Sequence, residues 1–217
     1  MSFLNDWLQD YPSLLSGLWV SVRLAGVTLF IGMPCGLLLA LGASADSRGL
    51  RVCTIALVEI GRGTPALVML QLVYFGLPSV HLTFSSFVAA TLALVLTTAA
   101  YTSEIIRGGL QAVPAGEVEA AHALGMAQKD TLRFIVIPQG VRVAIPALMG
   151  FSILIFQATS LAYTIALPEL LSQAYSRGST TFRYMSVLAL AGLLYAAITI
   201  PTSWLSERAE KRLARHL

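Results

Sequence analysis

Two pairs of charged residues lie within or at the ends of long apolar runs in this sequence. Glu59 and Arg62 are three residues apart in one run, and Glu104 and Arg107 are three residues apart at the end of another. A charge in a hydrocarbon interior costs roughly 2.5–3.5 kcal/mol, so such residues normally pair or face a polar route. Spacing of i, i+3 on a helix permits pairing. We expect Glu104 and Arg107 to form a structural pair that anchors the segment after them.

Arg62 is the first candidate for contact with a polar solute that crosses a membrane. It is followed by Gly63, Thr64 and Pro65, a run that interrupts a helix and frees backbone polar groups. Two interpretations remain open. In the first, Arg62 and Thr64 line a solute path together with the freed backbone. In the second, Glu59 and Arg62 only pair with each other.

A second polar group lies near the end of a later apolar run. Gln157 is 15 residues beyond Arg142, about 22 Å along a helix. Gln157, Thr159 and Ser160 therefore fall toward the outer part of a hydrocarbon core about 30 Å thick, where a solute delivered from outside would be held. For the two hydroxyls, the alternative is hydrogen bonding between helices, which is common in membranes. The Gln157 amide is the stronger candidate.

Histidine and cysteine do not combine into a catalytic or metal-binding group. His81, His122 and His216 are far apart in the sequence, and none is placed as the base of a nucleophile. Cys35 and Cys53 lie in or beside apolar runs, without a Cys-x-x-Cys or Cys/His grouping. We expect no catalytic residue, no bound metal and no disulfide. A membrane-embedded enzyme remains only an alternative function.

Composition indicates that most of the chain lies in lipid. The 217 residues are 56% hydrophobic and 12% charged, whereas soluble domains carry about 25% charge. The net charge of +3 does not cluster on a soluble face, so we expect no nucleic-acid partner. Because a spanning helix needs roughly 20 apolar residues, the sequence predicts an all-α membrane protein with five transmembrane helices, at residues 14–41, 54–77, 84–106, 141–167 and 184–205. Breakers within these spans, such as Gly32 and Pro65, indicate helices that face other helices.

The distribution of lysine and arginine predicts the orientation. Five spans divide the basic residues outside them into two unequal groups. The larger group contains Arg48, Arg51, Arg107, Lys129, Arg133, Arg142, Arg208, Lys211, Arg212 and Arg215, and the smaller contains Arg177 and Arg183. Cytoplasmic loops carry the excess of positive charge. We therefore expect the N-terminus outside and the C-terminus in the cytoplasm.

A polar insert at about residues 107–140 separates the third and fourth spans on the cytoplasmic side. Pro114 is a typical helix-start residue, and Glu117 and Glu119 in the first turn complement the positive end of the helix dipole. Gly125 is placed as the glycine that ends a helix. The sequence predicts a short helix of about two turns here, followed by a second short helix that ends at Pro138.

The first of these helices has a narrow apolar face. Val118, Ala121 and Leu124 recur at every third position, and Ala120 and Ala123 add small residues that let another backbone approach closely. This stripe is too narrow to hold the helix on lipid, so we expect it to dock into a partner. The alternative is an ordinary amphipathic helix lying on the membrane surface.

The insert resembles the EAA loop of binding-protein-dependent ABC importer permeases. Glu119-Ala120-Ala121, then Gly125, Ile135 and Ile137-Pro138 have that motif's spacing, with Ile137 where leucine is usual. The resemblance extends from Gly17 to Arg212 and is strongest to the polar amino acid branch. The segments that carry it are Arg62-Gly63-Thr64-Pro65, Ala100-Tyr101 with Glu104 and Arg107, Pro138-Gln139 with Arg142 and Pro146, and Thr159-Ser160-Leu161. Glu117 and Gln157 depart from it, standing where glutamine and lysine respectively are common.

This resemblance implies that residues 1–217 form one type-1-like ABC transporter transmembrane domain of the bacterial inner membrane. The short helix, with Glu119, Ala120, Ala121, Leu124 and Gly125, would then dock in a cytoplasmic ATPase dimer, and Pro138 would close the motif. An external solute-binding protein would deliver a polar amino acid. The run Gln157 to Leu161 is somewhat closer to permeases for acidic amino acids.

The sequence independently requires a separate ATPase for such a function. A P-loop needs Gly-Lys-Ser/Thr, but Lys129 and Lys211 follow Gln128 and Glu210. ATP and Mg would therefore be bound by the partner, and this chain would bind no cofactor. Five helices are too few to enclose a polar route, so we expect a second permease subunit, identical or paralogous, and alternating access between the two. An ion-coupled secondary transporter or a channel is the alternative, although neither needs a docking helix.

Overall fold

Every regular element in the described part of the chain is helical. The structure is a computed structural model that describes residues 3–213, with side chains described for residues 7–211. Arg215 and His216 lie outside the described residues, as does the side chain of Arg212. Four helices within the described residues are long and apolar enough to cross a membrane, namely Trp7–Ala43, Ser86–Gln111, Gln128–Ile165 and Tyr184–Lys211, and a bent pair of helices would make a fifth crossing.

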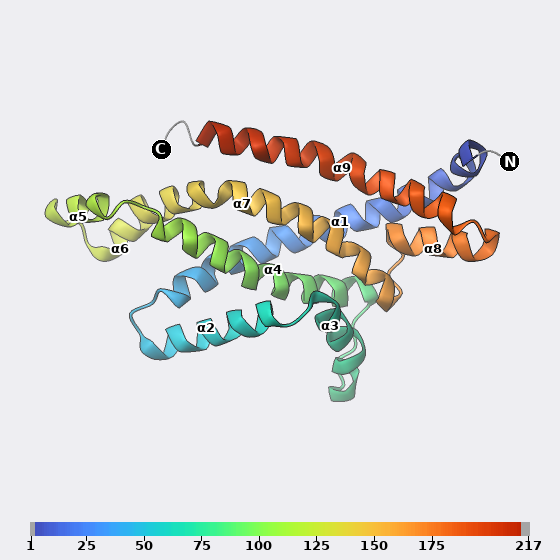
Figure 1. The fold of residues 1–217 in the computed structure, drawn as a ribbon. Coiled ribbons are helices and arrows are strands. Elements are labelled where there is room, and N and C mark those ends of the chain that lie inside the picture. Colours follow the sequence, from blue (N-terminus) through green and yellow to red (C-terminus); the bar gives the residue numbers. More distant parts are fainter. Residues whose placement is uncertain (1–2, 214–217) are drawn as a thin grey trace.

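The bundle is built on α1 (Phe3–Ala43) and α4 (Ser86–Gln111), which make the most extensive helix contact in the described chain (Figure 1). Glycines allow this approach: a Cβ on Gly32 would lie 2.6 Å from Thr98 Cγ2, and one on Gly36 would overlap the Thr102 hydroxyl. Small residues at such crossings let membrane helices pack closely. The breaker Gly32 therefore faces another helix, as the sequence predicts.

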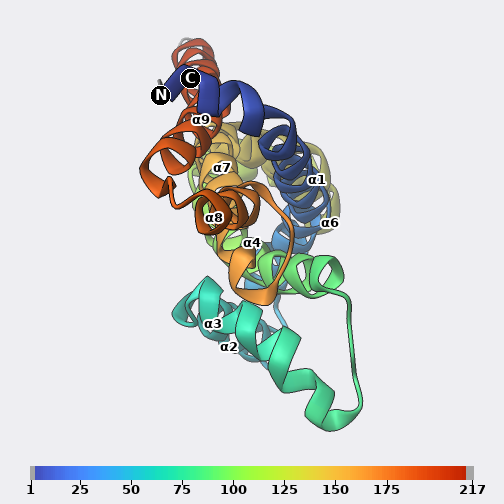
Figure 2. The ribbon, with the colours of Figure 1, turned by 90° about the vertical axis from the view of Figure 1, so that its right-hand side faces the viewer.

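The second apolar run is not one straight helix. The expected span at 54–77 divides into α2 (Arg48–Gly63) and a second piece made of α3 (Ala66–Gln71), the π-turn η1 (Leu72–Gly76) and η2 (Leu77–Val80), which is bent by 99° from α2. The residue before a proline is driven out of the helical conformation, and Thr64 before Pro65 is extended at φ −89° and ψ 124°. Figure 2 shows this second piece projecting from the bundle.

The chain also differs from expectation beyond the fourth span. After α7 (Ile137–Ala158) and the 3-10 turn η4 (Thr159–Ile165), it forms α8 (Leu170–Thr181), a helix that sequence analysis did not predict, and then α9 (Tyr184–Leu213). Leu170 of α8 is buried with Leu14 of α1 and Val187 of α9 in one apolar cluster. Packing from two other helices thus stabilises a segment whose own composition is too polar to indicate a buried helix.

The insert between the third and fourth spans is shorter than expected. It contains α5 (Ala115–Ala123), α6 (Gln128–Thr131) and a π-turn, η3 (Leu132–Val136), which runs directly into α7. The expected second helix therefore does not end at Pro138 but continues as the fourth spanning helix. Pro138 lacks the N–H that a regular helix would use at that point, and the π-turn lies directly before it.

Candidate functional site

The short helix α5 has the ends that its sequence predicts. It starts directly after Pro114, and Gly125 beyond its end adopts φ +78°. The Gly125 N–H donates to the His122 carbonyl and the Met126 N–H donates to the Ala121 carbonyl. These two bonds form a Schellman motif, which needs a left-handed residue at the glycine position. Gly125 therefore fixes where the helix stops and how the chain leaves it.

The predicted apolar stripe of α5 divides between two directions. Ala121 is 2% exposed and Val118 is half-buried, so both pack toward the rest of the chain. Leu124 is 84% exposed, because it is the cap residue at which the chain already leaves the helix. Glu119 and Ala120 are exposed as well. Of the predicted docking residues, Glu119, Ala120, Leu124 and Gly125 are exposed, whereas Ala121 packs α5 against the rest of the chain.

The insert is held at its base by two glycines, one on each side. A Cβ on Gly140 of α7 would lie 2.6 Å from the Leu110 Cα, and a Cβ on Gly109 of α4 would overlap the Gly140 carbonyl. One step further out, the Gln139 amide donates a hydrogen bond to the Glu117 carboxylate. The side-chain bond connects α5 to α7, and the backbone crossing connects α7 to α4.

The four charged residues singled out in the sequence form one connected group. Arg62 Nη1 lies 3.5 Å from Glu59 Oε1, and Arg107 donates to both oxygens of Glu104 at 2.9 and 2.6 Å. Both predicted i, i+3 pairs are therefore present. Sequence analysis missed the link between them, since Arg62 Nη1 also lies 3.5 Å from Glu104 Oε2.

Tyr101 on α4 completes the surroundings of Arg62. Its hydroxyl donates to the Arg62 carbonyl at 3.2 Å, its ring lies 6.0 Å from the Arg62 guanidinium, and it stacks on Phe151 of α7. Thr64 donates to the Ile60 carbonyl of its own chain segment. The Arg62 side chain nevertheless remains 36% exposed. Arg62 is thus paired and partly exposed, so both interpretations from the sequence stay open.

The polar residues at the end of α7 separate into two kinds. The Thr159 hydroxyl is buried and donates to the Phe156 carbonyl, and the Ser160 hydroxyl donates to the Gln157 carbonyl. Both hydroxyls donate to backbone carbonyls of their own segment, and the Thr159 hydroxyl also interacts with the Tyr195 hydroxyl on α9, as the expected alternative of bonding between helices has it. The exposed Gln157 amide has no hydrogen bond to another described residue. Of the three, Gln157 is the group free to bind a solute.

Sequence analysis also missed Glu169, a fully buried acid. Its carboxylate accepts bonds from the Leu171 and Ser172 N–H groups at the start of α8, from the Tyr195 hydroxyl at 3.0 Å and from the Ser21 hydroxyl at 3.4 Å. Burial raises the pKa of this carboxyl, against the lowering effect of the two backbone donors. An acid after Pro168 is a helix N-cap signal, but its partners on α1 and α9 are distant in the sequence.

The helical bundle, the bent second span and the tethered helix α5 are the features to be compared with known proteins, and that comparison identifies the family. A family model described as "Binding-protein-dependent transport system inner membrane component" matches residues 32–215. The chain belongs to this family.

Curated relatives define the transport class further. The chain is 33% identical over 210 residues to a probable amino-acid ABC transporter permease protein, YckA, of Bacillus subtilis, covering 97% of this chain and 93% of that protein. It is 38% identical to the nopaline transport system permease protein NocM of Agrobacterium fabrum, with 97% and 91% covered. It is 32% identical to HisM, the histidine/lysine/arginine/ornithine permease protein of Escherichia coli, with 97% and 92% covered. The chain is a non-catalytic permease subunit of an amino-acid ABC importer.

Solved structures agree in fold. A crystal structure of an amino acid ABC transporter with histidines aligns with a TM-score of 0.91 and 32% identity, over 98% of this chain and 99% of that one. An inward-facing MetNI methionine ABC transporter aligns with a TM-score of 0.71 and 21% identity, over 91% of this chain and 96% of that one. The prediction from the sequence that this chain is an ABC importer permease is confirmed. The alternatives of an ion-coupled carrier, a channel and a membrane enzyme are set aside.

Proposed function

We propose that this chain crosses the bacterial inner membrane five times, with its N-terminus outside and its C-terminus in the cytoplasm. Four long apolar helices and the bent pair from α2 to η2 supply the five crossings. The excess of basic residues at the α5 end of the bundle supports the orientation, because cytoplasmic segments carry that excess.

In this proposal, α5 transmits the closure of a cytoplasmic ATPase dimer to the membrane helices. Glu119, Ala120 and Leu124 form the contact surface, and Gly125 fixes the end of the helix. Ala121 packs α5 against its own chain, and Pro138 stands at the start of α7. ATP and Mg bind to the partner. A second permease subunit, a copy or a paralogue, supplies the rest of the solute path.

The transported solute in this proposal is a polar amino acid. One observation carries the proposal. The Arg62 side chain is paired with Glu104 and yet stays 36% exposed, so it can still contact a solute. Gln157 supplies an exposed amide. Thr64 lies two residues after Arg62, and Thr159 and Ser160 lie two and three residues after Gln157. An arginine and an amide can both donate to the carboxylate that every amino acid carries. The acidic class within this proposal is supported by the resemblance of the run Gln157 to Leu161 to permeases for acidic amino acids, and an external binding protein would deliver the solute.

Coupling is tested by reconstituting the complex with its ATPase and binding protein. We expect Glu119→Lys and Gly125→Leu to abolish solute-stimulated ATP hydrolysis while insertion into the membrane is retained. Glu210→Lys is the control, because Glu210 lies on the distant helix α9 and is exposed. Unchanged coupling in both variants would contradict the role of α5, and transport without any ATPase would overturn the proposed function.

The solute class is tested separately by competition. Uptake of labelled glutamate should be reduced by unlabelled aspartate more than by arginine or cystine. Stronger competition by arginine would show that the acidic assignment is wrong and would leave the permease function standing. Ligand-dependent stabilisation of the binding protein with the same compounds gives an independent measurement.

A further inference from the structure

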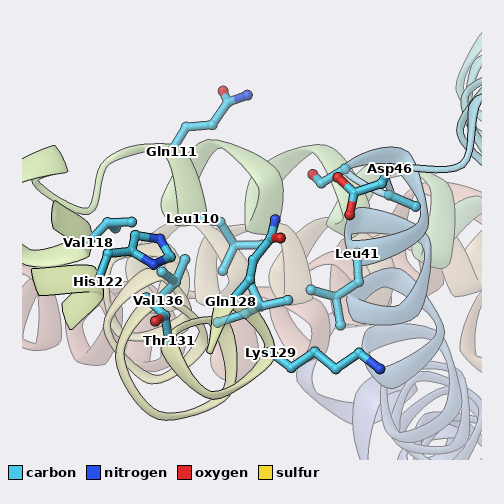
Figure 3. A pocket seen from close by; sticks show the side chains of 13 residues that line it. Leu41, Asp46, Leu110, Gln111, Val118, His122, Gln128, Lys129, Thr131 and Val136 are labelled. Carbon is cyan, nitrogen blue, oxygen red and sulfur yellow. The ribbon is translucent and has the colours of Figure 1, made fainter. Parts of the chain in front are cut away.

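A pocket of about 580 Å³ lies behind α5, between that helix and the bundle (Figure 3). Its walls come from the ends of α1 and α4, from α5, and from α6 with η3. The residues that line it are Leu41, Ser44, Ala45, Asp46, Leu110, Gln111, Val118, His122, Gln128, Lys129, Thr131, Leu132 and Val136. Its volume is in the range of small-molecule sites, about 300–1,000 Å³.

The lining combines an apolar floor with two opposite charges. Leu41, Leu110 and Val136 contribute the apolar surface, and Figure 3 shows the Leu41 side chain between Asp46 and Lys129 in that view. Within the described residues, neither Asp46 nor Lys129 makes an ion pair or a side-chain hydrogen bond. An apolar pocket with a few unpartnered polar groups is the usual form of a ligand site.

The Asp46 carboxylate and the carbonyl ends of two helices supply negative charge on one side of the pocket, next to the Arg51 guanidinium, which donates to the Ala45 carbonyl at 3.5 Å. Helix α1 ends at Ala43 and helix α4 ends at Gln111, and both ends belong to the pocket wall. The carbonyl end of a helix carries partial negative charge, which adds to the Asp46 carboxylate. Lys129 on α6 gives the opposite charge for an oxyanion. The complementary ligand is therefore a zwitterion with an apolar stem.

The position of the pocket favours a lipid as the source of that ligand. The apolar part of α1 ends at Leu41, and the apolar helix of α4 ends at Gln111, so the pocket lies where two spanning helices leave the hydrocarbon. Phospholipid headgroups occupy this level of a bilayer at high local concentration. Basic pockets between spanning helices on the cytoplasmic side bind lipid headgroups, and Lys129 supplies the basic group here.

We propose that this pocket binds the phosphoethanolamine headgroup of a lipid from the cytoplasmic leaflet. The ammonium donates to Asp46 and to carbonyls at the ends of α1 and α4, and the phosphate pairs with Lys129. Because Val118 and His122 of α5 form one wall, a bound headgroup connects α5 to α1. This site is separate from the solute path and from the outward surface of α5.

The test is lipid retention by the purified complex of this chain with its ATPase and second permease subunit, measured by native mass spectrometry. The complex is exchanged into phosphatidylethanolamine, phosphatidylcholine or phosphatidylglycerol. Phosphatidylcholine has a methylated ammonium without N–H donors, and phosphatidylglycerol has no ammonium. We expect wild type to retain phosphatidylethanolamine about tenfold better than either, the effect of losing one charge-assisted hydrogen bond.

Matched variants test the separate roles of Asp46 and Lys129 in binding the headgroup. Asp46→Asn should abolish the preference for phosphatidylethanolamine over phosphatidylcholine, and Lys129→Gln should weaken retention of both lipids. Asp130→Asn and Lys211→Gln are the controls, since both residues are exposed charges outside the pocket lining. Equal retention of the three lipids by wild type, or the same loss in Asp130→Asn as in Asp46→Asn, would overturn the proposal.

A free amino acid has the same zwitterionic chemistry, so leucine forms a second arm of the experiment. Leucine that binds in an Asp46-dependent manner and displaces phosphatidylethanolamine would overturn the lipid source and support a cytosolic ligand of the same class. Failure of leucine to displace the lipid supports the lipid. Retention is measured without transport, so failure here is distinguishable from failure of the importer function.

Discussion

Arg62 on α2 and Glu104 on α4 form an ion pair at 3.5 Å that joins two local pairs into one charged group. The group contains two acids and two bases, so its charges are balanced within the bundle. Helices α2 and α4 contribute one arginine and one glutamate each, so the group joins the two helices. Arg62 contacts both acids and Glu104 contacts both arginines, so these two residues are its central members.

Removal of the Arg62 charge should therefore reduce transport without removing the protein from the membrane. We expect Arg62→Gln to lower uptake about fivefold, since a partly exposed charged contact is worth about 1 kcal/mol. Uptake is compared at equal abundance in the membrane. Arg48→Gln, at the exposed start of the same helix, should leave uptake unchanged. Full activity of Arg62→Gln would mean that the residue only packs.

The crossing at the base of the insert should not tolerate a side chain. Gly140→Ala places a methyl group 2.6 Å from the Leu110 Cα, and we expect this overpacking to cost about 1–3 kcal/mol of stability. Thermal unfolding of the purified complex measures the loss. Gly150→Ala is the matched control on the same helix, because its Cβ would meet nothing within 4 Å. Equal midpoints for the two variants would contradict a tight crossing.

The bond between Glu117 and Gln139 predicts a variant with impaired coupling. Gln139→Ala should raise the ATP hydrolysed per solute transported, because α5 is then free to move without α7. The exchanged pair, Glu117→Gln with Gln139→Glu, should restore the ratio, since the amide and carboxylate are still opposite each other. Glu207→Ala, at an exposed acid on α9 outside the pocket lining, should have no effect. Failure of the exchanged pair to rescue would rule out a role for this particular bond.

Burial of Glu169 predicts a pH-dependent stability. Its folded-state pKa is raised, so the folded protein holds this proton more tightly than the unfolded chain does. The contribution to stability is present below the unfolded pKa and is lost as pH rises through the folded pKa. Glu169→Gln should flatten this decline in a series of thermal unfolding midpoints against pH. Glu207→Gln, an exposed acid on α9, should leave the slope as in wild type, and a wild-type slope in Glu169→Gln would contradict the assignment.

The sequence indicates local features of this protein better than distant ones. The pair Glu104–Arg107 and the stop at Gly125 depend on residues three to five positions apart, and both were predictable. The link from Arg62 to Glu104 and the bonds from Glu169 to Ser21 depend on how helices pack, which spacing alone does not determine. Pro65 predicts that the helix is interrupted after α2. The angle of this bend, 99°, could not be predicted from the sequence.

The length of α1 has a consequence for the outside of the molecule. Its 41 residues extend about 60 Å, roughly twice the thickness of the hydrocarbon core, so in the proposed orientation its first turns stand clear of the lipid. There Trp7 donates to the Ser186 carbonyl, and Asp10 lies 3.5 Å from Arg177 of α8. A delivering protein would thus meet a pre-ordered platform instead of a loose chain end, and its docking would require little additional ordering.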